Sequence, residues 1–375
     1  MIYDKPYKNT QELIGILEDR ELHFIDRNTA NDLLNTVGYY DLINAYKKFF
    51  YKSTNPERYK ENLSFEYLYN FYYVDKEFQN VMLNGILLIE NIFKNKISQI
   101  LSSKYGVHQD DYMSKNIFQN KSYRIDGKKT HSNTFIKQLY DKKVNSNNPC
   151  NAISHYKNRH NHIPAWILFK DFTFMEIINF YRFLNTKDQE DIADKMIVAK
   201  IPVAEKVKHL KKMLQFLRKN RNIIAHNDLF IGNRVSPDMT NPEINTMLPN
   251  ILKTISTYQS NTYSLICFII ILLDAEILRR NFIARIKRMN IYNGNNYLNT
   301  YYNFLKLPKD FNVIIDNYHK ILNNNNLETM IKGNKKRKIY HLQNGVYYNY
   351  LKPENTIYFN DENEAVLNGY RKSNR

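Results

Sequence analysis

Cysteine is scarce in this sequence, which contains only Cys150 and Cys267, far apart and without a CxxC spacing. This scarcity argues against a disulfide framework and against a thiolate zinc site, and it makes a reducing cytoplasm the default location. The stretch HYKNRHNH contains His155, His160 and His162, but no carboxylate or thiol is near and the spacing suits no zinc motif. A solvated or RNA-facing basic loop is the better interpretation. We therefore expect no bound metal and no cofactor.

Long apolar runs are also missing. The longest extends from Leu265 to Leu273 and is followed by Asp274 and Glu276, whereas a membrane-spanning helix needs about 20 apolar residues. The first residues, MIYDKPYKNT, lack the apolar stretch of a signal peptide. We interpret the apolar run as a buried helix and expect a cytoplasmic protein without a membrane partner.

Acidic residues are few, since 37 Asp and Glu stand against 54 Lys and Arg, which gives a net charge of +17. Such an excess favours polyanionic partners, nucleic acid first and an anionic membrane surface second. An AT-rich coding sequence would explain the abundant lysine, but it does not readily explain so few acidic residues. Contact with nucleic acid is the better interpretation.

Helical periodicity dominates what is present, so we expect a mainly α fold. The polar stretch at 107–163 has weak periodicity and is interpreted as loops around one helix at 133–144. The loop at Arg124–His131 contains Gly127, which argues against a fixed arginine–histidine pair there. Asn-rich segments at 293–299 and 323–326 indicate linkers on either side of one more helix. The other predicted helices cover residues 9–21, 28–36, 64–104, 163–184, 203–226 and 250–288.

The last forty residues have a different pattern. The runs KKRKIYHL, GVYYNYL and NTIYF are short and β-rich, and a helix-like DENEAVLNG follows them. We expect a small β-containing appendage at residues 335–375.

The predicted helix at 203–226 contains an unusual charge pattern. Its apolar residues recur at helical spacing, and Arg221 occupies the position that completes their stripe. A guanidinium in a core-facing stripe is unfavourable unless it is paired. Asn222 and His226 are four residues apart and share a face, so the segment reads Arg-Asn-x-x-x-His. The stripe consists of Val207, Leu210, Leu214, Leu217 and Ile224.

This motif resembles the signature of the HEPN superfamily, whose active members are metal-independent ribonucleases. Other blocks of the sequence resemble successive blocks of the AbiD/AbiF-type abortive-infection family, in the same order and over about residues 5–290. One departure is Thr-Phe-Met at 173–175, where that family usually has Ser-Phe-Gly. The blocks are KPYKNTQELIGILEDREL (5–22), VGYYDLINAY (37–46), the tract at 75–96 and IPAWILFKDFTFMEI (163–177).

The resemblance implies a domain organisation. It predicts a HEPN-like helical domain at 61–290, preceded by an N-terminal helical segment at 1–60 and followed by a helical linker at 291–334. The appendage at 335–375 resembles a small Ada-type metal-binding module. Gly345 or a neighbour, and Ser373, stand where that module has cysteine, so we expect a metal-free relic used for docking or for RNA contact.

The resemblance also implies a function, an endoribonuclease that shuts down a phage-infected cell. His226 would move the proton as base or acid, Arg221 would hold the phosphate, and Asn222 would orient His226 or the phosphate. Family members form a cleft from two copies, which implies a homodimer, and are associated with a regulatory non-coding RNA. Read without the resemblance, Arg221 is a buried salt-bridge residue and His226 a cation at a helix end. A non-catalytic RNA-binding or phage-sensing interaction protein is the alternative.

Two groups of residues are expected to support this site. Glu90 interrupts another apolar stripe, so we predict that its carboxylate pairs with Arg221; the alternative is that it tilts to solvent. Four cations border the motif helix and could follow an RNA backbone, or they could form an ordinary solvated face. These are Lys211, Lys212, Arg218 and Lys219.

Overall fold

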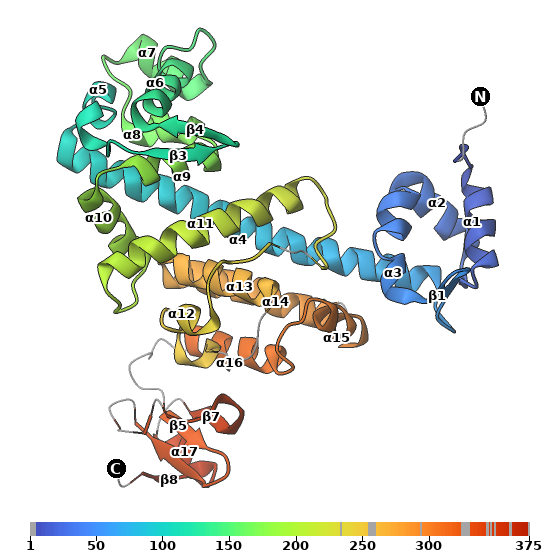
Figure 1. Cartoon of the computed structure of the whole chain (residues 1–375). Coiled ribbons are helices and arrows are strands. Elements are labelled where there is room, and N and C mark those ends of the chain that lie inside the picture. Colours follow the sequence, from blue (N-terminus) through green and yellow to red (C-terminus); the bar gives the residue numbers. More distant parts are fainter. Residues whose placement is uncertain are drawn as a thin grey trace.

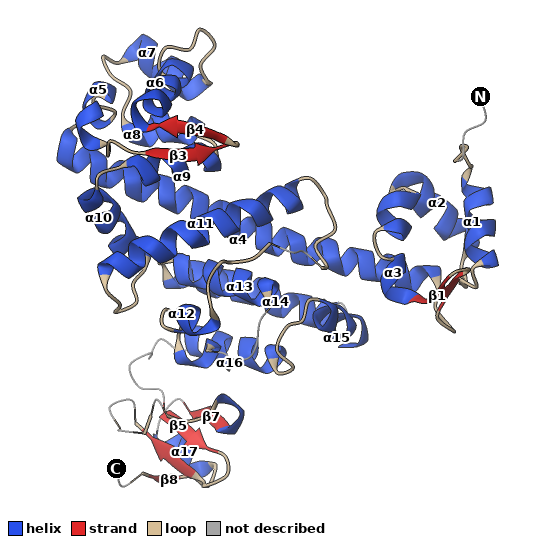
Figure 2. Cartoon of the chain, in the orientation of Figure 1, coloured by secondary structure: helices blue, strands red, loops and turns tan. Residues whose placement is uncertain are grey.

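The structure is a computed structural model that describes residues 5–232, 235–253, 260–292, 295–323, 331–342, 345, 347–348, 350–359 and 362–373. Within these residues the chain is mainly α-helical and carries only small sheets, which confirms the predicted fold class (Figure 2).

The longest helix, α4 (Phe65–Tyr105), runs through most of the molecule (Figure 1). Ser64 caps its start by accepting a hydrogen bond from the Tyr67 N–H. Gly106 follows its last residue with a φ of 109°, a conformation that favours glycine. The prediction of a helix over 64–104 is therefore confirmed.

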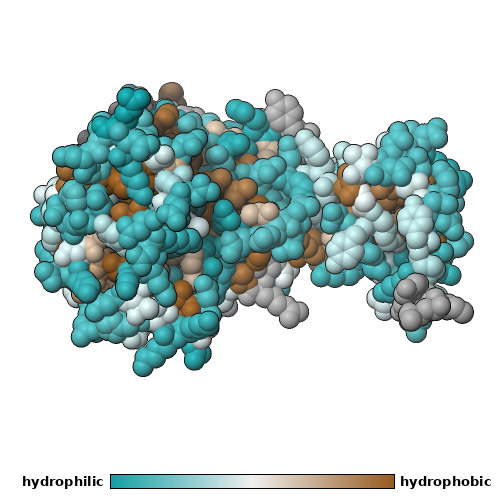
Figure 3. Space-filling view, turned by 90° about the horizontal axis from the view of Figure 1, so that it is seen from above, coloured by the Kyte–Doolittle hydropathy of each residue, from teal (hydrophilic) through white to brown (hydrophobic). Residues whose placement is uncertain are grey.

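The residues before α4 form a lobe that projects from the main body (Figures 1 and 3). A capping box fixes its first helix, because the side chains of Asn9 and Glu12 each accept from the other's backbone N–H. The two predicted helices are confirmed, but this segment also contains a β-hairpin that the sequence did not predict. Its elements are α1 (Thr10–Asp19), α2 (Arg27–Thr36), the π-helix η1 (Tyr40–Asn44), α3 (Lys47–Phe50), β1 (Tyr51–Thr54) and β2 (Glu57–Tyr59).

Residues 107–163 pack near the C-terminal end of α4 and are more ordered than predicted (Figure 1). Asp126 and Gly127 have φ values of 47° and 80°, which are typical of a type I′ hairpin turn. The interpretation of Arg124–His131 as an irregular loop is therefore wrong, because Arg124 pairs with Lys129 in an antiparallel ladder. The elements are α5 (Gln109–Tyr112), the 3-10 helix η2 (Lys115–Ile117), β3 (Ser122–Ile125), β4 (Lys128–His131), α6 (Ser132–Lys143) and α7 (Asn151–Arg159).

The predicted helix at 163–184 is interrupted. A new helix starts after Thr173, which forms a capping box with Glu176. The next helix, α10, was not predicted; its buried Asp188 accepts hydrogen bonds from Lys104 and Tyr105, which fastens it to the end of α4. The elements are α8 (Ala165–Leu168), the 3-10 helix η3 (Phe169–Asp171), α9 (Phe174–Phe183) and α10 (Thr186–Met196).

The remaining helices complete the main body. Gly85 allows a close approach to α4, because a Cβ atom there would lie 2.9 Å from Ile269 and 3.1 Å from Phe282. The predicted helix at 250–288 is divided into shorter helices. Where one further helix was expected, the structure has two, with Pro308 between them. The linker predicted at 293–299 is wrong over residues 295–299, which form the start of a helix. The predicted linker residues 293–294 and 324–326 lie outside the described residues. The elements are α11 (Val203–Ala225), α12 (Asn241–Asn245), the 3-10 helix η4 (Asn250–Leu252), α13 (Asn261–Leu272), α14 (Glu276–Tyr292), α15 (Asn295–Phe304) and α16 (Phe311–Asn323).

The apolar run at 265–273 is a buried helical segment, as predicted, since these residues are at most 8% exposed. The surface seen from above is mainly hydrophilic, with small scattered apolar patches (Figure 3). Within the described ranges, no helix combines the length and the apolar character needed to cross a bilayer.

The carboxyl-terminal residues form a separate small sheet with its own core (Figure 1). Its strand order is β7-β5-β6-β8, in which β6 and β8 are parallel and the other pairs antiparallel. The sheet begins at Ile331, four residues before the predicted start, and the described residues of the run 345–351 form turns instead of a strand. The elements are β5 (Ile331–Asn334), β6 (Ile339–His341), the 3-10 helix η5 (Pro353–Asn355), β7 (Thr356–Phe359), α17 (Glu362–Leu367) and β8 (Arg371–Lys372).

Candidate functional site at the end of helix α11

Helix α11 packs against α4 through the predicted apolar stripe. Leu210, Leu214 and Leu217 are fully buried, Ile224 is 7% exposed and Val207 is partly buried. Polar residues are buried on this helix too. They include Asn220, which donates to the Phe216 carbonyl, and His209, whose burial lowers its pKa.

The C-terminal end of α11 is closed by a Schellman motif. The N–H of Asn227 donates to the Ile224 carbonyl and that of Asp228 to the Ile223 carbonyl. Asn227 has a φ of 59°, a left-handed conformation that asparagine tolerates better than most residues. The motif turns the chain sharply just after His226.

Two contacts hold this turn against α4. The Lys76 ammonium donates to the Asn227 carbonyl at 3.2 Å, and the ring of Phe230 lies 5.9 Å from that of Phe78. Burial lowers the pKa of Lys76, while the nearby carboxylates of Asp75, Asp41 and Asp228 act to raise it. Sequence reasoning missed Lys76, which places a cation beside the predicted site.

Arg221 lies in this helix end and is partly buried. Its Nε atom is buried without a hydrogen-bond partner. Within the part of the chain that the structure describes, no hydrogen bond or ion pair holds its guanidinium. Leaving a buried donor unpaired costs about 1–3 kcal/mol. The interpretation of Arg221 as a buried salt-bridge residue therefore has no support, because no acidic partner is found among the described residues.

Asn222 and His226 occupy the last turn and the C-cap of α11. Asn222 is partly buried, and its carbonyl accepts the His226 N–H at 3.0 Å. The His226 side chain is exposed. The structure thus brings Arg221, Asn222 and His226 to one helix end.

The predicted ion pair between Glu90 and Arg221 is wrong. Glu90 instead binds the ammonium of Lys94, one turn along the same helix, at 2.7 Å. Helices α4 and α11 are antiparallel (Figure 1), and Lys76 lies beside Asn227. From this contact, Glu90 lies about 21 Å further along the axis of α4. Arg221 lies only about 9 Å from the contact in the same direction, along α11. This register keeps the carboxylate away from the guanidinium.

The four predicted RNA-binding cations do not form one free surface. Lys211 is partly buried and donates to the Gln189 side chain at 2.6 Å; its burial lowers its pKa. Lys212 donates to the Asp238 carbonyl at 2.6 Å. Arg218 is partly buried with a contact to Gln215, whereas Lys219 is exposed.

A buried hydrogen-bond cluster next to the site was not predicted. Asp75, which is fully buried, accepts from Tyr46 and Gln79 at 2.6 and 2.7 Å and from Tyr301 at 2.7 Å. Burial raises the pKa of this carboxyl group, although these hydrogen bonds act against the shift. The cluster joins the N-terminal lobe and α15 to α4, one residue before Lys76. The sequence signal that could have indicated this cluster was an aspartate within an apolar helix face.

The described residues do not suit the thiolate metal site of an Ada-type module. Cys267 is buried in α13 and Cys150 precedes α7, so neither lies in the carboxyl-terminal sheet. Gly345 and Ser373 offer no thiolate. In the described ranges, no group of three or more His, Cys, Asp or Glu residues is placed to hold a metal ion.

The fold and this helix end define a mainly helical protein with an arginine and a histidine gathered at one helix terminus. A family model described as Abi-like protein matches residues 32–231, which is more than half of the chain. The chain therefore belongs to the Abi-like protein family. This membership supports a role in phage defence by abortive infection. Searches among curated proteins and among solved structures found no match.

Proposed function

We propose that this protein is a metal-independent endoribonuclease whose site contains Arg221, Asn222 and His226. The observation that carries the proposal is the buried, unpartnered Nε of Arg221, close in sequence to an exposed His226. An arginine that its own fold leaves unpaired is available to an anionic ligand, and a phosphodiester matches its fork of donors. The net charge of +17 supports a polyanionic substrate.

The chemistry needs only groups that RNA and these residues provide. The 2′-oxygen attacks the adjacent phosphorus, its proton passes to a base, and the bond from phosphorus to the 5′-oxygen breaks. The leaving 5′-oxygen takes a proton from an acid, which gives a 2′,3′-cyclic phosphate and a 5′-hydroxyl. An imidazole can act as base or acid near neutral pH. Arg221 would stabilise the charge that develops on the phosphoryl oxygens.

Each chain supplies one such histidine, whereas the reaction uses both a base and an acid. We therefore include a homodimer in the proposal, with the His226 residues of two copies facing one cleft. A regulatory RNA that restrains the nuclease also belongs to the proposal, and the family resemblance and the excess of cations support it.

Replacing His226 with alanine should lower the rate of RNA cleavage by about 10²–10⁴-fold, because a general acid or base is lost. The His226 side chain is exposed, so thermal unfolding should change little. Cleavage of a labelled unstructured RNA is measured, and mass spectrometry identifies the cyclic phosphate. His155→Ala, which removes another exposed histidine from α7, is the matched control and should cleave like the wild type.

Equal cleavage by His226→Ala and the wild type would remove His226 from the mechanism. A wild-type chain that binds RNA but cleaves none would favour the non-catalytic RNA-binding protein. Expression of the two variants in cells adds a second measurement, since toxicity should disappear with His226→Ala and persist with His155→Ala.

The proposed dimer predicts a mass of twice 45.0 kDa in solution. Multi-angle light scattering at micromolar concentration measures this mass directly. A fully active chain that stays at 45.0 kDa would contradict the two-copy cleft and leave a single His226 to serve both proton transfers.

A further inference from the structure

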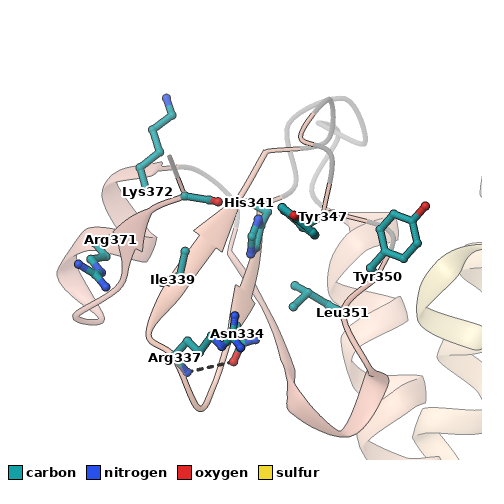
Figure 4. Close-up of a pocket in the computed structure, with 10 residues that line it drawn as sticks. Asn334, Arg337, Ile339, His341, Tyr347, Tyr350, Leu351, Arg371 and Lys372 are labelled. Carbon is teal, nitrogen blue, oxygen red and sulfur yellow. Dashed lines mark hydrogen bonds between the residues drawn. The ribbon is translucent and has the colours of Figure 1, made fainter. Parts of the chain in front are cut away.

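The carboxyl-terminal sheet contains a pocket of about 530 Å³, outside the α11 site (Figure 4). Its lining comes from the β5–β6 hairpin, from the segment between β6 and β7, and from β8. This volume falls within the range of about 300–1,000 Å³ that is common for small-molecule sites. The pocket is therefore large enough for one nucleotide-sized group.

One side of this pocket is cationic. Arg337, Arg371 and Lys372 line it, and Figure 4 shows them on the opposite side from the tyrosines. Lys372 pairs with Glu362 at 3.1 Å. No contact within the described ranges holds the side chains of Arg337 and Arg371, which are exposed. Among the described residues that line the pocket, none carries a carboxylate. Two guanidinium groups at a lining without carboxylates suit a phosphate.

The other side is aromatic. The ring centroids of His341 and Tyr347 are 6.3 Å apart, and those of Tyr347 and Tyr350 are 6.5 Å apart. Tyr347 is 43% exposed and Tyr350 is 78% exposed. Exposed rings beside cations are the usual platform for stacking the bases of single strands.

His341 adds an independent sign of a ligand. Its side chain is 9% exposed and lines the pocket, yet its Nδ1 atom is buried without a hydrogen-bond partner. Buried polar atoms in proteins almost always have a partner. A base edge or a sugar hydroxyl in the pocket would supply one.

We propose that this pocket binds one nucleotide of a single-stranded nucleic acid. The arginines hold its phosphate, a tyrosine stacks on its base, and the Nδ1 atom of His341 contacts its base or sugar. The proposal adds a second nucleic-acid site to the chain and does not depend on cleavage at His226.

The test uses the full chain and uncleavable probes of about eight nucleotides, a length within the site sizes of single-strand binders. One probe is 2′-O-methyl oligouridine and the other is oligothymidine, and binding is followed by fluorescence anisotropy over a salt series. Arg337→Ala with Arg371→Ala should weaken binding at least tenfold and lower the salt slope by about 0.7, the value for one phosphate of a single strand. Tyr350→Ala should weaken binding about tenfold.

A matched control removes equal charge from the same hairpin outside the pocket. Lys335→Ala with Lys336→Ala takes two exposed cations that do not line the cavity, and it should change affinity less than twofold. An equal loss in both double variants would overturn the pocket in favour of general surface charge. Polyphosphate that binds as tightly as the oligonucleotides would overturn the stacked base.

Photocrosslinking separates this site from the one on α11. A probe that contains 5-iodouracil should form an adduct with Tyr347 or Tyr350, identified by peptide mass spectrometry. Adducts confined to peptides of α11 would overturn the pocket while leaving the nuclease proposal intact. Preference for one of the two oligonucleotides identifies RNA or DNA as the strand that the pocket selects, and equal binding indicates recognition through features that both share.

Discussion

Arg221→Met should abolish most RNA cleavage and at the same time make the protein more stable. The guanidinium is proposed to stabilise the developing phosphoryl charge, and loss of such a donor lowers rates by about 10²–10³-fold. The same substitution removes a buried Nε that has no partner and keeps an unbranched side chain of similar length. Relief of an unsatisfied buried donor should raise the free energy of unfolding by about 1 kcal/mol.

Cleavage rates and urea unfolding of the same preparations measure both effects. Arg27→Met is the control, because it removes the same charge from an exposed side chain on α2, where it pairs with Glu18 in the N-terminal lobe. It should leave cleavage within a few-fold of the wild type. An Arg221→Met variant that loses stability would instead assign Arg221 to the fold, and one that cleaves normally would exclude it from the chemistry.

Asp75→Ala should lower the free energy of unfolding by about 3 kcal/mol or more. Its carboxylate accepts from Tyr46, Gln79 and Tyr301, and all three donors would lose their acceptor in a buried place. Each stranded donor costs about 1 kcal/mol or more. Urea unfolding followed by circular dichroism measures the loss. Asn80→Ala, an exposed change on the same helix, should stay within about 0.5 kcal/mol of the wild type.

Asp75 also predicts a pH dependence. Because burial raises its pKa in the folded state, the folded chain binds this proton more tightly than the unfolded chain does. The contribution of Asp75 to stability is therefore complete below the ordinary carboxyl pKa and is lost as the pH rises through the raised one. The stability of the wild type relative to Asp75→Asn should improve on acidification from pH 8. An unchanged difference over that range would contradict the raised pKa.

The sequence predicts the long elements of the fold because their signals are local. Helix α4 has a serine cap, an apolar periodicity and a terminal glycine, and the stripe of α11 is buried as its spacing indicates. The Asp126-Gly127 turn was also a local signal, a strong one for a hairpin, but the polar character of the flanking residues concealed it. Helix α10 depends on Asp188 reaching the end of α4, which no local pattern encodes.

The sequence predicts which residues gather at the end of α11 but not what surrounds them. A charge in an apolar stripe indicates that a partner is needed, and it does not say which one. Glu90 finds Lys94 on its own helix, a pairing four residues apart that the sequence contains. The approach of Lys76 to Asn227 depends on the axial register of α4 and α11. An apolar stripe on each helix indicates that the two helices pack together, but it does not determine that register.

The projecting lobe on α4 has a hydrodynamic consequence. A compact protein of 45.0 kDa exposes about 15,700 Å² of surface, whereas this chain exposes 20446 Å². The projecting lobe gives the molecule an elongated outline (Figure 1). The friction of an elongated body with solvent exceeds that of a sphere of equal mass. A monomer will therefore diffuse slowly and leave a gel-filtration column early, at a volume that a calibration with compact standards would assign to a heavier particle.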